Sequence, residues 1–233
     1  MTTGPRPAPV RARGSLIRSL ADNSATGSVA TRMRRRRFQL FQSLLETLNG
    51  HIEILDIGGT QQFWDLMLPK HPENIRVTLL NIEHQQTNGR QFVSAVGDAR
   101  SMPQYERESY DVVFSNSVIE HVGDYESQRR MADEIRRVGK RYFVQTPNKR
   151  FPLEPHFLFP FFQYLPIETR AWLVNRFDVG WYQRIPDRAR AREEVESIQL
   201  LTRKRFAALF PGATIRDEKF FGLTKSFVAI GGW

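Results

Sequence analysis

The stretch Ile52–Thr60 constrains the fold more than any other part of this chain. It is a run of apolar, strand-forming residues that contains one acid, Asp56, and ends at two glycines, Gly58 and Gly59. The segment 61–68, which follows directly, can start a helix. A buried strand, a glycine turn and a helix N-terminus together form the nucleotide- or nucleoside-binding corner of parallel α/β sheets.

The acid Asp56 narrows the class of ligand that this corner would bind. A carboxylate would repel a pyrophosphate, but it suits a cationic or hydroxyl-rich molecule. S-adenosyl-L-methionine (SAM) carries an ammonium and a sulfonium and no phosphate, so it fits this requirement. The third glycine of the dinucleotide fingerprint is absent after Gly59, which argues against a nicotinamide-dependent dehydrogenase.

Beyond this corner, strand patterns and helix patterns alternate along the chain. The expected strands lie at 52–57, 76–81, 91–95, 110–115, 141–145, 213–220 and 226–230. The expected helices lie at 33–48, 61–68, 84–88, 124–138, 167–176 and 202–210, and the charged segment 184–196 is either a loop or a short helix. Strands separated by helices predict a three-layer, doubly wound α/β sheet of seven mostly parallel strands. The C-terminal hairpin predicts an antiparallel edge strand.

Composition excludes several classes of site. The 233 residues include no cysteine, so disulfides, thiolate zinc sites and a cysteine nucleophile are ruled out. No apolar run reaches the roughly 20 residues that a membrane-spanning helix needs. The histidines at 51, 71 and 84 form no metal-ligand spacing with a carboxylate, so the sequence predicts no metal site.

Positive charge is concentrated at the N-terminus. Residues 1–50 hold nine arginines and two acids, which is +7 of the total net charge of +9. We therefore expect residues 1–30 to be a disordered basic tail and 31–233 to be the folded domain. The run Arg34–Arg37 either faces solvent or meets an anionic partner such as a membrane surface, polysaccharide or RNA. Because the folded body is nearly neutral, nucleic acid is a disfavoured partner.

Motifs at the ends of three expected strands resemble those of class I SAM-dependent methyltransferases. They are Leu55-Asp-Ile-Gly-Gly59, Gly97-Asp-Ala99, and Tyr110-Asp-Val-Val-Phe-Ser-Asn116 with Val118-Ile-Glu-His-Val122. The terminal Phe210-Pro-Gly-Ala213 and the hairpin also fit. The resemblance runs from about Glu53 to the end of the chain and implies the Rossmann-like methyltransferase fold, with SAM as the cofactor.

The resemblance also implies a role for each residue at these strand ends. Asp56 would hold the methionine ammonium, directly or through water, and Gly58 and Gly59 would let the backbone pass the aminoacyl part of SAM. Asp98 would accept the adenine amino group, with the Ala99 N–H facing the ring. Two further residues would line the methyl-transfer pocket, namely Ser115 and Asn116.

Two departures from the family pattern concern residues that would bind SAM. Thr60 and Gln62 stand where the family has its second and third glycines, so Gln62 must point away from the ligand. The family usually has an acid at the end of the second strand for the ribose hydroxyls, and this chain has Asn81. Either Asn81 or Glu83 would take that role.

Methyl transfer to a hydroxyl benefits from a general base, and histidine is the side chain best tuned for it. His121 follows the fourth strand, and His156 lies in the loop after the fifth, with Glu154 placed to orient it. His121 can equally serve a structural or SAM-side role, and His156 can equally be a solvent-facing loop residue.

The segment 147–200 interrupts the alternation and is expected to be a lid over the site. Its first part, 151–166, is rich in phenylalanine, which indicates either the packed underside of the lid or an apolar contact with a substrate or a membrane. The sequence thus predicts a cytoplasmic enzyme, in contact with a membrane surface if the tail and lid bind one. It would methylate a small or lipid-linked acceptor at oxygen. An RNA- or polymer-binding relative and a non-catalytic SAM-fold module are the alternatives.

Overall fold

The computed structural model describes residues 28–70 and 72–233, so most of the predicted basic tail and His71 lie outside the described part. Its helices are α2 (Val29–Leu45), α3 (Gln61–Met67), α4 (Tyr125–Val138), α5 (Ile167–Arg176), α6 (Arg188–Glu196), α7 (Arg203–Leu209) and the short 3₁₀ turns η1 (Ile119–His121) and η2 (Phe162–Tyr164). Its strands are β1 (Ile52–Ile57), β2 (Ile75–Asn81), β3 (Phe92–Val96), β4 (Tyr110–Asn116), β5 (Gly139–Pro147), β6 (Leu153–Glu154), β7 (Phe159–Pro160), β8 (Thr214–Phe220) and β9 (Leu223–Gly231).

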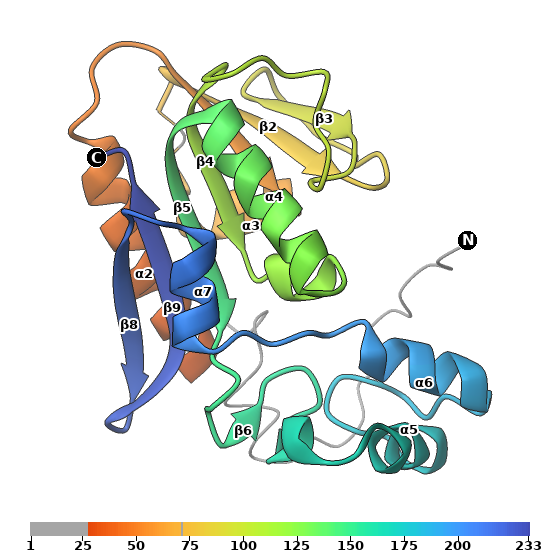
Figure 1. Cartoon of the computed structure of the whole chain (residues 1–233). Coiled ribbons are helices and arrows are strands. Elements are labelled where there is room, and N and C mark those ends of the chain that lie inside the picture. The colour runs from red at the N-terminus through yellow and green to blue at the C-terminus, as the bar shows by residue number, and fades with distance from the viewer. Residues whose placement is uncertain (1–27, 71) are drawn as a thin grey trace.

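Seven strands form one twisted sheet in the order β3-β2-β1-β4-β5-β9-β8 (Figure 1). Strands β1 to β5 are parallel, and β9 runs antiparallel to both β5 and β8. The chain reverses direction across the sheet between β1 and β4, which places the topological switch point beside the glycine turn. The predicted fold class, a seven-stranded, mostly parallel Rossmann-like sheet with an antiparallel C-terminal strand, is confirmed.

Helices cover both faces of the sheet and create two cores. On one face, Phe38 and Phe41 of α2 and Trp64 of α3 pack against the aromatic strand residues Phe114 and Phe143. The other face is covered by α4 and α7, whose apolar sides pack against the opposite side of the same strands. Burial of both faces explains why the central residues of β4 and β5, 112–114 and 142–144, are continuous apolar runs.

Two predicted elements differ from the structure. The segment 84–88 is not helical, because side-chain oxygens of Ser94 and Gln61 bind its backbone N–H groups and hold it as a loop. The antiparallel strand is also not at the edge. Strand β9 is buried beside β5, and the edge position belongs to β8, whose charged side chains suit an exposed strand.

The insertion between β5 and α7 forms a lid beyond the carboxyl ends of β4 and β5 (Figure 1). The charged segment that the sequence left open between loop and helix contains α6, which begins after the N-cap Asp187. The lid has a small core of its own, in which Phe157 and Phe162 pack against α5 and α6. No helix in residues 28–70 or 72–233 is long and apolar enough to cross a membrane.

Candidate active site

The glycine turn after β1 is shaped by contacts within the protein. Gly58 has φ +73°, and a Cβ there would come within 2.5 Å of the Val118 side chain. A Cβ at Gly59 would overlap the Asp56 carboxylate. Both glycines are therefore required by the close packing of this turn, whether or not a ligand lies against it.

Asp56 lies beneath this turn and does not face open solvent. Its side chain is 1% exposed, and its Oδ2 accepts a 2.7 Å hydrogen bond from Nε1 of the buried Trp64. Burial raises the pKa of Asp56 to about 7, although the Trp64 hydrogen bond acts in the opposite direction. The predicted contact between Asp56 and the methionine ammonium stays a prediction, and this burial favours its indirect form.

The end of β2 is fastened to the glycine turn. Asn81 donates from its side-chain nitrogen to the Gly59 carbonyl at 2.9 Å, which leaves the amide oxygen as the acceptor that a ribose hydroxyl would need. Glu83, the alternative ribose ligand, is exposed. Thr60 is the N-cap of α3, and its hydroxyl accepts from the Phe63 N–H.

Asp98, after β3, is held by a near neighbour in the chain. The Arg100 guanidinium donates from Nε and Nη2 to both carboxylate oxygens at 2.7–3.0 Å. These hydrogen bonds keep the pKa of Asp98 below its ordinary value, so it is ionised at neutral pH. Ala99 is buried beside it. An adenine amino group would have to share the Asp98 carboxylate with Arg100.

At the end of β4, the two predicted pocket residues differ in accessibility. Ser115 is fully buried, and its hydroxyl has no hydrogen-bond partner among the described residues. Asn116 is half-buried and accepts a short hydrogen bond from Arg37. Asn116, but not Ser115, lines an open hollow at this edge of the sheet.

This hollow has a cationic lining, and we call it the cationic pocket. It is formed by the N-terminal part of α2, the ends of β4 and β5 and the start of β9, with Arg34, Arg37 and Lys225 among its residues. Arg37 pairs with Glu218 at 2.7 Å. Burial and repulsion from Arg37 lower the pKa of Arg34 to about 10, and the same two causes lower the pKa of Lys225. Three cations thus lie in a partly desolvated space, and only Arg37 among them forms an ion pair within the described residues.

Sequence reasoning missed this pocket. It treated Arg34–Arg37 as one charge run, whereas the helix turns Arg34 and Arg37 inward and leaves Arg35 and Arg36 exposed. The three-residue spacing of the inward pair was visible in the sequence. The positions of Glu218 and Lys225 were not, because nothing local connects them to α2.

Both candidate bases lie together at the same edge. The His121 and His156 rings are perpendicular, with centroids 4.8 Å apart. His156 Nδ1 lies 2.7 Å from the Glu154 carboxylate, as the sequence suggested, and the neighbouring Glu120 is fully buried. The positions of these histidines agree with a base role for either one, and the assignment stays a prediction.

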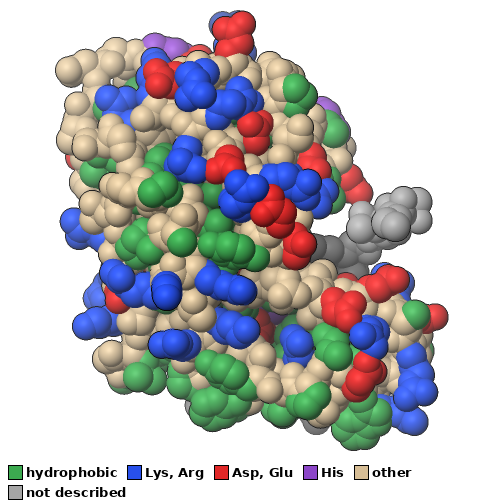
Figure 2. Space-filling view, in the orientation of Figure 1, with side chains coloured by type: hydrophobic (Ala, Val, Ile, Leu, Met, Phe, Trp, Pro, Cys, Tyr) green, Lys and Arg blue, Asp and Glu red, His purple; other side chains and the backbone are tan. Residues whose placement is uncertain are grey.

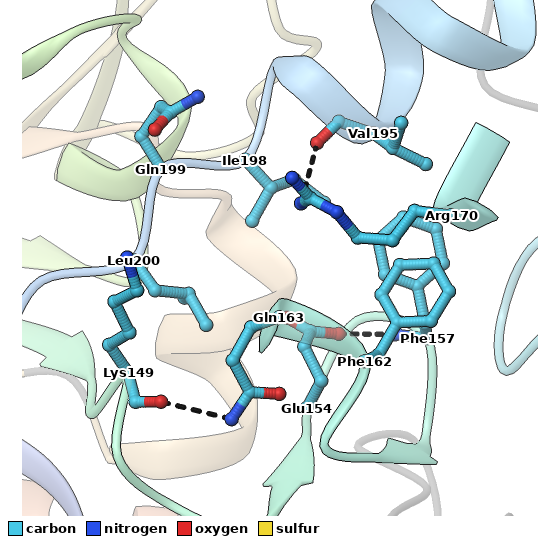
Figure 3. Close-up of a pocket in the computed structure, with 10 residues that line it drawn as sticks. All are labelled: Lys149, Glu154, Phe157, Phe162, Gln163, Arg170, Val195, Ile198, Gln199 and Leu200. Atoms are coloured by element: carbon cyan, nitrogen blue, oxygen red, sulfur yellow. Dashed lines mark hydrogen bonds between the residues drawn. The ribbon is translucent and has the colours of Figure 1, made fainter. Parts of the chain in front are cut away.

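The lid contains a second, partly open hollow, shown in Figure 3. Its floor includes Glu154, while Phe157 and Phe162 line one side and Arg170 donates to the Val195 carbonyl. The phenylalanine-rich segment 151–166 therefore has a buried part and an exposed part. Part of it packs the underside of the lid, whereas Phe159 and Phe161 are 36% and 57% exposed.

The strands that lead to this edge of the sheet match a known family model. Residues 55–142, which include β1 to β4 and the start of β5, match the family model of a methyltransferase domain. A search of curated proteins finds no match.

Solved structures share the fold at low sequence identity. The CurJ carbon methyltransferase is 16% identical over 88% of this chain, with a TM-score of 0.57, and this chain spans 55% of that structure. Magnesium protoporphyrin IX methyltransferase from Synechocystis PCC 6803, solved with bound SAH, is 11% identical over 86% of this chain and 83% of that one, with a TM-score of 0.52. At these identities the likeness concerns the fold alone.

Proposed function

We propose that this chain, whose residues 55–142 match the model of a methyltransferase domain, transfers the methyl group of SAM to an oxygen of a small or lipid-linked acceptor. The cofactor is SAM, which supplies a methyl group on a positively charged sulfur that is already activated for displacement. The chain's own residues then have to bind, orient and exclude water.

The residues at the carboxyl ends of β1 to β4 fit SAM chemically. The Asn81 amide oxygen and the Asp98 carboxylate are acceptors for ribose hydroxyls and an adenine amino group. Asp56 adds a carboxylate under the turn, and nothing in this set resembles a pyrophosphate site. These groups lie at strand ends next to the switch point, where open α/β sheets bind ligands.

The observation that carries the acceptor proposal is the cationic pocket. It opens at the ends of β4 and β5, next to the predicted methyl-transfer residue Asn116, and is lined by Arg34, Arg37 and Lys225, of which Arg37 pairs with Glu218. A surplus of partly buried cations favours an anionic ligand, because the ligand would offset the desolvation and the mutual repulsion. We therefore expect the acceptor to carry a carboxylate or a phosphate beside the hydroxyl that is methylated.

Transfer at oxygen is supported by the two histidines. Glu154 accepts from His156 Nδ1, which orients the ring and leaves Nε2 as the nitrogen that can take a proton from an acceptor hydroxyl. His121 is close enough to share this role. The expected loss on removing a positioned base is about 100-fold or more in kcat.

A membrane surface is the environment we propose for a lipid-linked acceptor. Phe159, Phe161 and Tyr164 of the lid are exposed, and the β8–β9 turn adds Phe221, which is 91% exposed. Figure 2 shows hydrophobic side chains gathered along the lower edge of the molecule, where the lid lies. Aromatic side chains suit the bilayer interface, and basic residues nearby suit anionic lipid headgroups.

Calorimetry with SAM and with S-adenosylhomocysteine tests the core of this proposal. A folded protein that binds neither would overturn it and favour a non-catalytic module. Transfer is then followed as S-adenosylhomocysteine formation with pairs of hydroxybenzoates and the corresponding hydroxybenzamides. We expect the carboxylates to be preferred in the native protein and the preference to be lost in Arg37→Ala, whereas equal rates for both members of each pair would remove the anionic-acceptor claim.

The membrane proposal has a separate test. The native protein should co-sediment with vesicles that contain 30% anionic lipid, on the order of the composition that attracts basic proteins. Phe161→Ser with Phe221→Ser should release it, and Trp172→Ser, also an exposed aromatic of the lid, serves as the comparison variant. No co-sedimentation of the native protein would contradict this part.

A further inference from the structure

Glu120, His121 and His156 converge although they lie on two different loops. Glu120 and His121 belong to η1, directly after β4, and His156 follows β6 in the lid. One ligand atom from each of the three lies within 4.8 Å of the other two. Ligand atoms around one metal ion stand about 3–3.5 Å apart when bonds are near 2.1 Å, so the longest separation in the set has to shorten by more than about 1 Å when a metal binds.

Glu120 contains a buried oxygen with no hydrogen bond among the described residues, although the charge of the residue interacts with His156. The residue is 0% exposed, and its Oε2 accepts from the Thr146 hydroxyl at 2.9 Å. Its Oε1 is buried and has no hydrogen-bond partner among the described residues. Buried carboxylates in proteins are normally paired or coordinate a metal, so this oxygen points to a ligand.

Neighbouring groups fix the orientation of the set. Glu154, itself 2% exposed, accepts from His156 Nδ1 at 2.7 Å and from the backbone N–H groups of His156 and Phe157. A carboxylate on one imidazole nitrogen, with the other nitrogen turned to a metal, is the usual arrangement at metal-binding histidines. Thr146, on β5, holds Glu120 in place by donating a hydrogen bond from its hydroxyl to Oε2.

We propose that Glu120, His121 and His156 bind a divalent first-row transition metal of the zinc type, with coordination positions left for oxygen ligands. Two imidazoles with one carboxylate are typical ligands of such ions, whereas magnesium and calcium prefer sets made of oxygen ligands alone. Three protein ligands are characteristic of zinc sites that keep an open position.

The position of the site suggests which ligand would complete it. Ser117 and Pro155 line the cationic pocket, and they precede Glu120 and His156 closely in the chain. With a metal bound, His121 and His156 would be ligands and not the base. The metal would bind the acceptor hydroxyl and lower its pKa, and the proton would pass to solvent water before methyl transfer. This role rests on the proposed function, whereas metal binding itself does not.

No metal site was predicted from the sequence, because only the spacing of histidines along the chain was considered. His121 and His156 are 35 positions apart, and the lid brings them together. The complete absence of cysteine simplifies the test, since no thiolate can bind the metal nonspecifically.

The test is titration of chelator-treated, full-length protein with Zn²⁺ and with Co²⁺, followed by calorimetry and by the visible absorption of Co²⁺. We expect one equivalent of tightly bound metal. His121→Ala and His156→Ala should each weaken binding at least 100-fold. Glu154→Gln, which removes only a positioning group, should weaken it 10- to 100-fold. His51→Ala removes an exposed histidine that also pairs with a carboxylate, Glu53, and should change nothing.

The proposal is overturned if the folded protein binds no metal, or if binding survives His156→Ala. Because neither SAM nor an acceptor is present, failure here leaves the methyltransferase proposal intact. Failure of SAM binding would likewise leave a measured metal site intact. Thermal melts of each variant exclude misfolding, and His121→Ala, which changes a partly exposed residue, is the variant that perturbs the fold least.

Discussion

The two halves of the candidate site are built in different ways. On the cofactor side, Asp56, Trp64, Asn81 and the glycine turn lie close together in the chain and are joined by direct hydrogen bonds. On the acceptor side, the partners come from distant segments. The ion pair of Arg37 with Glu218 spans 181 positions and joins the first described helix to the edge strand.

This difference indicates which half has a firm internal framework. The cofactor side rests on a fully buried core in which Trp64 contacts Phe38, Phe41 and Phe114. The acceptor side is open, partly solvated and carries surplus positive charge. We infer that the cofactor half is formed before SAM binds, whereas the acceptor half reaches its lowest free energy only with an anionic ligand in place.

Replacement of Trp64 should produce the largest effect and tests the rigid half. Trp64→Ala removes a fully buried ring and leaves Asp56 without its donor, so we expect a loss of about 3–5 kcal/mol in the free energy of unfolding. Trp64→Phe keeps most of the packing and should lose roughly 1–3 kcal/mol. Urea denaturation measures both. Trp172→Ala, a half-exposed tryptophan of the lid, is the control and should change stability little.

Asp56 should give the rigid half a distinctive dependence on pH. In the native protein the Asp56 carboxyl stays protonated up to about pH 7, whereas in the unfolded chain it loses the proton near the ordinary pKa of 3.8. The native state therefore binds more protons between about pH 4 and 7, and stability should fall as pH rises through that window and level off above it. The fall is on the order of 2–4 kcal/mol. Asp56→Asn, which keeps an acceptor for Trp64, should remove most of it.

The same variant decides how Asp56 acts on SAM. If the ionised carboxylate holds the ammonium, SAM affinity of the native protein should rise with pH up to about 7, and Asp56→Asn should be weak at every pH. Affinity that does not vary with pH and survives Asp56→Asn would mean that Asp56 only supports the turn. Calorimetric titrations between pH 5.5 and 8.5 distinguish the two outcomes.

Asp98→Ala should have a smaller effect, confined to the cofactor. Loss of its hydrogen bonds should weaken SAM binding about tenfold or more, corresponding to roughly 1.5–3 kcal/mol. Because Arg100 keeps the pKa of Asp98 low, this loss should be nearly constant from pH 5.5 to 8.5, unlike the Asp56 effect. Asp133→Ala on α4, an acid with an arginine partner on the helix surface, is the matched control. Unchanged affinity in Asp98→Ala would exclude the adenine contact.

The same contrast explains how much the sequence could predict. Strands 52–57 and 110–115 and the turn at Gly58 were predictable because apolar runs and glycines act locally. The prediction of a helix at 84–88 was wrong because side-chain oxygens of Gln61 and Ser94, which lie outside the segment, accept hydrogen bonds from its backbone. The burial of β9 depends on its pairing with β5, and the meeting of His121 with His156 depends on the lid. Such long-range pairings leave no periodic signal.

Replacement of Arg34 is the last test and has the smallest expected effect. It concerns the acceptor side of the site. Arg34 stands partly desolvated beside Arg37, and its guanidinium lies 5.9 Å from the centre of the Phe63 ring. If repulsion and desolvation outweigh the cation–π contact, Arg34→Met should stabilise the free protein by roughly 0.5–1 kcal/mol and weaken binding of an anionic acceptor. Arg35→Met, the exposed neighbour, should do neither. A clear loss of stability in Arg34→Met would show that Arg34 supports the fold, and the proposed dependence of this pocket on an anion would then fail.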